Sequence, residues 1–342
     1  MPGFDADQDI DVVVLWVDGS DPVLTAKRER YLKEEGITHS HSAALPTRYA
    51  SNNEIRYCVL SILTFAPFVR NIFLVTDGQD PDLYEDIRSH FPERLNSFKI
   101  VDHKEIFEGF EEFLPTFNSM SIEYMIWRIK GLSENFIYFN DDVFLVRETG
   151  PSDWFVGNRP VLRGRWKFPP YRKKAGHFIK RGIHRKILGN SDYHPRISFL
   201  LQQWKAAYLL GMRFRYYFLD HTPHPMNRKR LEAFFDDHPE VLKKNISYRF
   251  RSRDQFQITA LAYHLEIREG NHHLAPLNLT YLHPYYSAKR LLKKLAVSKQ
   301  NERIGSICVQ SLEMIDREVG DEVLGWMEQI LMIEHDKKER LK

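Results

Sequence analysis

Apolar runs of strand length alternate with segments of helical periodicity over the first 145 residues. Residues 12–17, 72–75 and 136–139 are continuous runs of Val, Leu, Ile, Phe, Tyr and Trp, as expected for strands that are buried on both faces. Between them, apolar side chains recur every three or four residues. Helices are expected over 53–66, 81–91 and 119–130 and over the charged segment 23–35, and a further short strand is expected at 99–101. Strands that alternate with helices predict a mainly parallel sheet with helices on its faces.

The amino-acid composition of the chain changes near residue 149. Residues 159–186 contain eleven Lys or Arg and no acid, interleaved with Trp166, Phe168, Tyr171 and Phe178. This stretch could contact nucleic acid, an anionic membrane face or an acidic polymer, or be a solvated loop. Helical spacing resumes at 197–210, 226–235, 254–266 and 307–333. We therefore expect one catalytic domain over 1–342, made of an α/β core (1–148), a basic–aromatic insertion (149–195) and a mainly helical part (196–342).

Composition and charge exclude several classes of protein. The 342 residues are 43% hydrophobic and 28% charged, an ordinary globular composition, and a net charge of +3 does not indicate a nucleic-acid partner. Cys58 and Cys308 lie in apolar patterns of helical spacing and are expected to be buried thiols. Residues 1–8 do not resemble a secretory signal, and no apolar run is long enough to cross a bilayer. These features predict a cytoplasmic protein and leave peripheral contact with the cell membrane open.

Carboxylates follow each of the three long apolar runs. Asp18 and Asp21 come after the first, Asp77 after the second, and Asn140-Asp141-Asp142 after the third. The carboxyl ends of parallel strands meet at one edge of the sheet, where ligands bind, so these acids should share a crevice. Acids held together repel each other unless a proton or cation lies between them, and hard oxygen ligands suit Mg²⁺ or Mn²⁺. The pattern predicts an enzyme that binds a phosphorylated ligand through a divalent metal.

Each of these loops also has a simpler interpretation. Asn140 and Asp141 can bond their own backbone in a turn. Asp18-Gly19-Ser20 can be a turn that leads into the next helix, with the glycine only permitting the turn.

Several basic and amide side chains could bind phosphate. Asn53, Glu54 and Arg56 open a predicted helix, where free N–H groups favour anions, although an ordinary capped first turn explains them as well. Arg251 is one of three arginines just before another helix, which fits a phosphate clamp or a solvated surface.

Two histidines flank a Thr-Pro turn after an aromatic run. His221 and His224 could serve as a general base or bind a metal, but the chain has fifteen histidines, and any one of them can be structural. Neither a Gly-Lys-Ser/Thr phosphate loop nor a Gly-x-Ser-x-Gly elbow occurs in the sequence.

Taken together, these segments resemble the signature regions of the Stealth phosphotransferases. The first region resembles residues 9–21, and the second resembles 48–79 together with 117–119, 122–123, 128–129 and 136–142. The third is similar to His221-Thr222-Pro223-His224-Pro225 with Phe250-Arg251-Ser252, and the fourth to 307–312. The segments occur in order along nearly the whole chain. One departure is Ser51, where the family usually has Asp.

The resemblance implies transfer of a sugar-1-phosphate, typically N-acetylhexosamine-1-phosphate from a UDP-sugar, to a hydroxyl of a glycan. The products would be a phosphodiester and UMP, in the synthesis of capsule or cell-surface polysaccharide. The expected fold is α/β, with a mainly parallel Rossmann-like or glycosyltransferase-A-like sheet flanked by helices and a helical C-terminal portion. Nucleic acid is not an expected partner.

On this hypothesis Asp141 and Asp142, with Asp18, hold Mg²⁺ or Mn²⁺. Arg251 and Arg56 bind phosphate oxygens, and His221 or His224 accepts the proton of the attacking hydroxyl. The candidate substrate-binding residues are Trp16, Asp18, Gly19, Ser20, Asn53, Glu54, Arg56, Asp77, Asn118, Arg128 and Asn140.

Two rival hypotheses remain. A metal-dependent nucleotide-sugar glycosyltransferase would use acids at strand ends in the same way but would release UDP. A non-catalytic polysaccharide-binding protein would use the basic–aromatic stretch and would ignore both metal and UDP-sugar.

Overall fold

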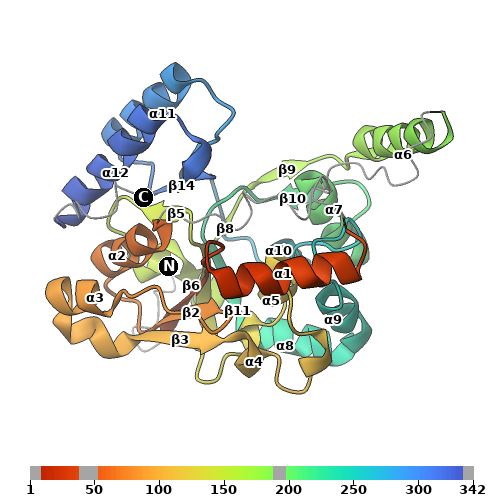
Figure 1. The fold of residues 1–342 in the computed structure, drawn as a ribbon, viewed down its shortest axis with the longest axis horizontal. Helices are drawn as coiled ribbons and strands as arrows, with labels where there is room; N and C mark the ends of the chain where they lie inside the picture. The colour runs from red at the N-terminus through yellow and green to blue at the C-terminus, as the bar shows by residue number, and fades with distance from the viewer. Residues whose placement is uncertain (1–8, 38–52, 188–197, 334–342) are drawn as a thin grey trace.

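The computed structural model describes residues 9–37, 53–187 and 198–333, which build a central sheet covered by helices (Figure 1). The sheet has the strand order β11-β4-β1-β2-β3. Four of its strands run parallel: β1 (Ile10–Leu15), β2 (Ile72–Thr76), β3 (Phe98–Asp102) and β4 (Asn135–Asn140). The edge strand β11 (His224–Asn227) runs antiparallel to β4. The predicted α/β class with a mainly parallel sheet is confirmed.

Side chains alternate between the two faces of the sheet, and each face has its own apolar core. Val12 and Val14 of β1 join a cluster with α2 (Glu54–Phe65) and α12 (Arg317–Leu331). Val13 and Leu15 join the opposite cluster, with α8 (Arg228–Asp237), α9 (Pro239–Ile246) and α10 (Ile258–Arg268). Because successive strand residues point to opposite faces, one continuous apolar run serves both cores.

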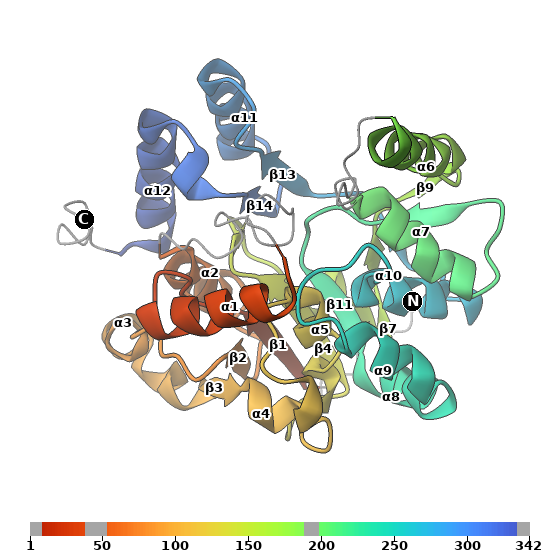
Figure 2. The same ribbon diagram turned by 45° about the vertical axis from the view of Figure 1, so that its right-hand side comes forward.

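The C-terminal part of the chain returns to the loop that carries the Asp pair. A three-stranded sheet joins β13 (Leu279–Leu282), β14 (Ser306–Val309) and β5 (Val143–Leu145), which begins directly after Asp142. The Val309 amide donates to the Asp142 carbonyl at 2.9 Å. Figure 2 shows this C-terminal segment, with α11 (Ala288–Gln300) and α12, above one end of the central sheet. One apolar cluster runs from Ile10 to Ile333, so both ends of the described chain share a core.

The remaining helices and strands surround this framework. They are α1 (Pro22–Glu34), α3 (Tyr84–His90), α4 (His103–Ile106), α5 (Ser119–Glu123), α6 (Tyr171–Lys186), α7 (Phe199–Leu209), β6 (Phe155–Val156), β7 (Arg159–Pro160), β8 (Leu162–Arg163), β9 (Arg165–Lys167), β10 (Tyr216–Phe218) and β12 (Leu274–Ala275). The predicted helices over 23–35, 53–66 and 81–91 correspond to α1, α2 and α3, with small differences at the ends. Among the described residues, no helix is both long enough and apolar enough to cross a bilayer.

Three expectations about secondary structure are wrong. Residues 119–130 do not form one helix, because α5 ends at Glu123 and a separate 3-10 turn covers Ile126–Arg128. The segment from 307 begins as strand β14, which pairs with β5 and β13, so Cys308 lies in a strand. Met226 also lies in a strand, β11, and not in the following helix. Both cysteines are nevertheless buried and free, as predicted. Residue 197, the start of a predicted helix, and Ser51 lie outside the described residues.

Candidate active site

A cavity of about 330 Å³ opens where β1, β2 and β4 end. Trp16 and Asp77 line it directly after β1 and β2, and Asn140 lines it as the last residue of β4. Its other walls come from α2, from the segment around residue 118, and from two C-terminal loops near residues 284 and 311. The parallel strands thus deliver polar side chains to one crevice, as the sequence pattern predicted.

The adjacent carboxylates of Asp141 and Asp142 line the cavity. Burial and the neighbouring charges of Asp142 and Glu54 raise the pKa of Asp141 well above its ordinary value. Burial also raises the pKa of Asp142, although the nearby His221 lowers it in part. The Cys308 thiol donates to Asp142 at 3.6 Å. This side of the cavity therefore concentrates negative charge that a bound cation would stabilise.

Only one of the two predicted histidines reaches the cavity. The His221 ring is stacked between Phe199, at 4.7 Å between centroids, and Tyr281, at 4.9 Å. Burial lowers the pKa of His221, and Asp142 partly opposes this effect. A neutral imidazole in a fixed plane beside the acid pair can accept a proton.

His224 lies behind the cavity and does not line it. Its ring packs edge-on against Tyr263 at 5.6 Å, and it belongs to the sheet strand β11. Burial lowers the pKa of His224 to about 3. The sequence left the choice between His221 and His224 open, and the structure places His221 at the site.

Arg251 brings positive charge to the same cavity. Its guanidinium donates to the Ser119 hydroxyl at 2.6 Å, and it lines the cavity. Behind it, Glu123 interacts with Arg251, Ser119 and Tyr138, while burial raises the pKa of this carboxyl to about 7. Tyr138 in turn donates to Asn140 at 2.7 Å. A hydrogen-bonded chain thus connects Arg251 to the residue before the Asp pair.

Glu123 was not among the predicted site residues. In the sequence it is one acid within a helical pattern, and its burial becomes visible only when Arg251, which lies 128 positions later, packs beside it. The only signal in the sequence was that Glu123 lies in a segment, residues 122–123, that resembles the second signature region.

Asp18 lies beside the cavity but does not line it. Its carboxylate accepts from the amide of Ser20 at 2.8 Å and from the Ser20 hydroxyl at 2.6 Å. The side chain of Gln79 bonds the main chain of Asp18 and the carboxylate of Asp21. Asp18, Gly19 and Ser20 thus form a turn that Gln79 holds, and the predicted set of three metal-binding carboxylates does not converge. In the described part of the chain, no three His, Cys, Asp or Glu side chains form a metal cluster.

Asp77 lines the cavity and is paired with Lys27 at 2.7 Å. Beside it, at 4.0 Å, lies His103, which the sequence reasoning missed. Burial lowers the pKa of His103 to about 4, so the ring is neutral at physiological pH. His103 directly follows β3, the next parallel strand, so the rule about strand ends could have identified it.

Asn118 lines the cavity, but its amide is used within the protein. It accepts from the Met120 amide at 3.2 Å and donates to Ser121, Tyr248 and Gln255. These bonds hold the loop of Ser119 against the segment of Arg251. Asn118 is therefore well placed to fix the Arg251 wall of the site.

Besides Asp18, Gly19 and Ser20, three more predicted substrate-binding residues lie outside the cavity lining: Asn53, Arg56 and Arg128. Asn53 occupies the N-cap of α2 in the left-handed region, with φ at 61°, and its neighbour Glu54 faces the cavity. The Arg56 guanidinium forms a two-pronged ion pair with Asp86, at 2.7 and 2.8 Å. Arg128 donates to the carbonyls of Ile106 and Glu108 at 2.7 and 2.8 Å. In these contacts both arginines support local structure.

Arg56→Met is expected to destabilise the fold and to leave catalysis in the folded protein nearly unchanged. The change leaves the partly buried carboxylate of Asp86 without its ion-pair partner. We expect this to lower the free energy of unfolding by about 1 to 3 kcal/mol. Denaturant unfolding, paired with turnover at a temperature well below the midpoint, measures both effects. A large loss of turnover at unchanged stability would instead indicate that Arg56 binds a phosphate of the substrate.

The C-terminal walls contribute side chains that sequence reasoning did not select. His283, Tyr285, Gln310 and Ser311 line the cavity. Ser311 has φ at 52°, in the left-handed region that a residue with a side chain rarely adopts. Ser311 follows β14, whose pairing with β5 and β13 brings it beside the Asp pair.

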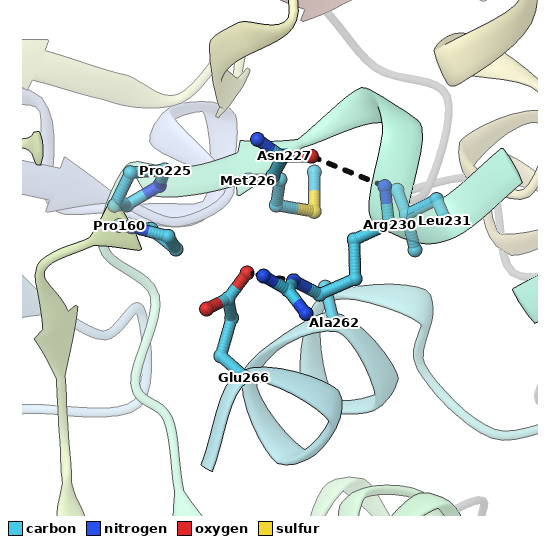
Figure 3. A pocket seen from close by; sticks show the side chains of 8 residues that line it. All are labelled: Pro160, Pro225, Met226, Asn227, Arg230, Leu231, Ala262 and Glu266. Atoms are coloured by element: carbon cyan, nitrogen blue, oxygen red, sulfur yellow. Dashed lines mark hydrogen bonds and ion pairs between the residues drawn. The ribbon is translucent and has the colours of Figure 1, made fainter. Parts of the chain in front are cut away.

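A second hollow, near β11, has a different character. Figure 3 shows Arg230 and Glu266 facing each other across it, with Pro160, Met226 and Ala262 around them. The two charged groups form an ion pair, and the hollow has no space for water. It is a packed part of the core, so the cavity at the strand ends is the better candidate site.

Two family models match the N-terminal part of the chain. Residues 8–36 match the description "Stealth protein CR1, conserved region 1", and residues 48–161 match "Stealth protein CR2, conserved region 2". The chain belongs to the Stealth family. The second region carries Glu54, Glu123, Asp141 and Asp142, so the family's conserved segment supplies the acid side of the cavity. The segments around His221, Arg251 and residues 307–312 stay predicted matches to the remaining regions.

Curated relatives of this Stealth chain bear names from polysaccharide synthesis. An exopolysaccharide phosphotransferase of Streptomyces coelicolor is 35% identical over 75% of this chain and 38% of its own length. A capsular polysaccharide phosphotransferase of Actinobacillus pleuropneumoniae is 41% identical over 55% of this chain and 47% of its own. The receptor polysaccharide phosphotransferase WefC of Streptococcus oralis is 29% identical, over 74% and 77%. The chain therefore spans less than half of the first two relatives.

Among solved structures, the chain aligns with the galactosyltransferase LgtC in complex with donor and acceptor sugar analogues. The alignment covers 96% of this chain and 98% of that one, with a TM-score of 0.45 and 10% identity. At this level the likeness says nothing about the reaction.

Proposed function

We propose that this Stealth protein transfers a sugar-1-phosphate, typically N-acetylhexosamine-1-phosphate, from a UDP-sugar to a hydroxyl of a glycan. The products are a phosphodiester-linked glycan and UMP. The observation that carries the proposal is the convergence of Asp141, Asp142, His221 and Arg251 on one cavity. The names of the relatives add that such chains act as phosphotransferases on polysaccharides.

The first requirement of this reaction is to balance the negative charge of the donor pyrophosphate. The pyrophosphate of the donor carries negative charge that must be balanced as the bond to UMP breaks. Arg251 supplies a guanidinium that can fork onto non-bridging phosphate oxygens. The contacts of this residue with Ser119 and Glu123 hold that guanidinium in place before the donor arrives.

A divalent metal fits the acid side of the cavity. Asp141 and Asp142 are partly buried oxygen donors, and burial raises the pKa of both carboxyls, so their ionised forms are poorly solvated. Mg²⁺ and Mn²⁺ bind through one or two carboxylates together with substrate phosphates, which matches a pair of acids without a third protein ligand. Such an ion would neutralise phosphate oxygens.

His221 is the candidate general base. It must take the proton of the acceptor hydroxyl as that oxygen attacks the phosphorus next to the sugar. Burial keeps the ring neutral, and stacking between Phe199 and Tyr281 fixes its orientation. Asp142 lies close enough to stabilise the imidazolium that results. His221, Asp142 and Arg251 therefore cover proton transfer, metal binding and phosphate binding.

Product analysis tests the proposal. The purified protein is incubated with a panel of UDP-sugars and a glycan acceptor, with Mg²⁺, with Mn²⁺ and with a chelator. We expect UMP to form with one UDP-N-acetylhexosamine, to depend on the acceptor and to stop with the chelator. Release of UDP would support the glycosyltransferase hypothesis. Glycan binding that ignores both metal and UDP-sugar, without turnover, would support the non-catalytic alternative.

A further inference from the structure

The basic stretch of the sequence forms an outward-facing helix that the proposed reaction does not use. Residues 171–186 fold into α6, which stands apart from the central sheet beyond α7 in both views (Figures 1 and 2). We use the name α6 surface for this helix together with the exposed side chains of Phe168 and Phe214 at its base.

The α6 surface exposes a continuous apolar face. Residues 171, 175, 178, 179, 182 and 183 are apolar or glycine, and steps of three and four bring them to one side of the helix. Phe178 is 80% exposed and Ile179 58% exposed, while Phe168 and Phe214 are each 87% exposed. Large apolar side chains grouped at such exposure mark a surface that binds something apolar.

The charges around this face are of one sign. Residues 159–186 contain eleven Lys or Arg and no acid. Lys173, Lys180 and Lys186 on the helix are exposed. The partner must therefore be anionic as well as apolar. Nucleic acid and acidic polysaccharide match the lysines but gain nothing from exposed Ile179 and Ile183, whereas an anionic lipid bilayer matches both.

The helix is fastened to the rest of the protein at its first turn. The ring of Tyr171 packs edge-on against Trp204 of α7 at 5.3 Å, and the Tyr171 hydroxyl donates to the Arg213 carbonyl at 3.2 Å. Lys174 lies over the same Trp204 ring. Phe199, the first residue of α7, stacks on His221. The α6 surface is thus held in a fixed relation to the cavity through α7.

We propose that the α6 surface docks the protein on an anionic phospholipid bilayer. The helix lies in the headgroup layer, with Phe178, Ile179 and Ile183 inserted at the acyl boundary and its lysines on lipid phosphates. The inference stands on the exposed side chains and charges alone, independently of the reaction in the cavity.

Vesicle sedimentation tests this proposal. The protein is mixed with phosphatidylcholine vesicles, with or without added phosphatidylglycerol, and the bound fraction is measured. We expect binding to vesicles that contain phosphatidylglycerol. The triple variant Phe178→Gln, Ile179→Gln, Ile183→Gln should bind roughly tenfold more weakly or worse, because the inserted apolar side chains are gone. Glutamine keeps the helix propensity close to that of the original residues, and circular dichroism checks the fold.

Two further variants sharpen the result. The variant Lys173→Gln, Lys180→Gln, Lys186→Gln should lose the preference for phosphatidylglycerol. The pair Leu292→Gln, Val297→Gln changes exposed apolar side chains on α11, another lysine-rich helix, and should bind like the wild type. Failure of the wild type to sediment with anionic vesicles, or equal sedimentation of the apolar triple variant, would overturn the proposal. Binding to heparin or DNA without binding to vesicles would overturn it too.

Discussion

Asp141→Asn is expected to reduce sugar-phosphate transfer by about a hundredfold to a thousandfold or more. Asparagine keeps the size of the side chain but removes the charge that a divalent metal and the phosphate chemistry require. The measurement is initial-rate kinetics of UMP formation at saturating donor and metal, supported by titration of the free protein with Mn²⁺. Near-normal turnover in this variant would remove the Asp pair from the mechanism.

The same substitution should not weaken the fold. Burial and neighbouring acids raise the pKa of Asp141 in the folded state, so the folded protein holds a proton there more tightly than the unfolded chain does. Above the ordinary pKa of an aspartate, the ionised carboxyl therefore costs stability, and asparagine removes that cost. Without metal, the thermal midpoint should stay the same or rise by about 2 to 4 °C.

Asp18→Asn is the matched control for the effect of Asp141→Asn on turnover. It changes an acid that the structure places outside the cavity, and turnover should fall less than tenfold.

His221→Gln is expected to lower kcat by roughly a hundredfold to ten-thousandfold, the range for loss of a general base. In the wild type, kcat/KM at saturating metal should fall as the pH drops through the lowered pKa of His221, since the protonated ring cannot accept a proton. Asp142, Asp220 and Arg251 are the charged groups that act on this ring, and burial is the dominant effect. In His221→Gln the acid side of the pH profile should shift or disappear.

The control for this prediction is His224→Gln. His224 is buried behind the cavity against Tyr263, so its replacement should lower stability and leave the kcat of the folded enzyme within about tenfold. A large loss of kcat in His224→Gln, with normal turnover in His221→Gln, would reverse the assignment of the base.

The sequence predicted the acid side of the site because that side depends on local pattern. Asp77 and the Asp141–Asp142 pair each follow a buried parallel strand, and parallel topology brings strand ends together whatever the loops do. Asp18 shows the limit of this rule. It also follows a strand, but its carboxylate is bonded to Ser20, Gln79 holds its main chain, and it does not line the cavity. The hydrophobic periodicity of the sequence does not reveal such contacts.

The rest of the site depends on long-range packing. Glu123 is an ordinary helical acid until Arg251 packs beside it, and Ser311 reaches the Asp pair only through the pairing of β14 with β5. Cys308 lies in β14, although the sequence predicts a helix there. The prediction fails because apolar residues in a short buried strand also fit helical spacing. Arg56 looked like a phosphate ligand at a helix start, but Asp86 of α3, thirty residues later, binds its guanidinium.

The fate of the donor phosphorus distinguishes transfer of a sugar-phosphate from transfer of the sugar alone. UDP-N-acetylglucosamine, or whichever UDP-sugar proves active, is labelled at the phosphorus next to the sugar and incubated with the protein, the acceptor glycan and Mg²⁺ or Mn²⁺. We expect the label to move to the glycan in a phosphodiester while unlabelled UMP is released, and Asp141→Asn to prevent both. Label that remains in UDP, with the sugar alone on the glycan, would contradict the proposed transfer of a sugar-phosphate.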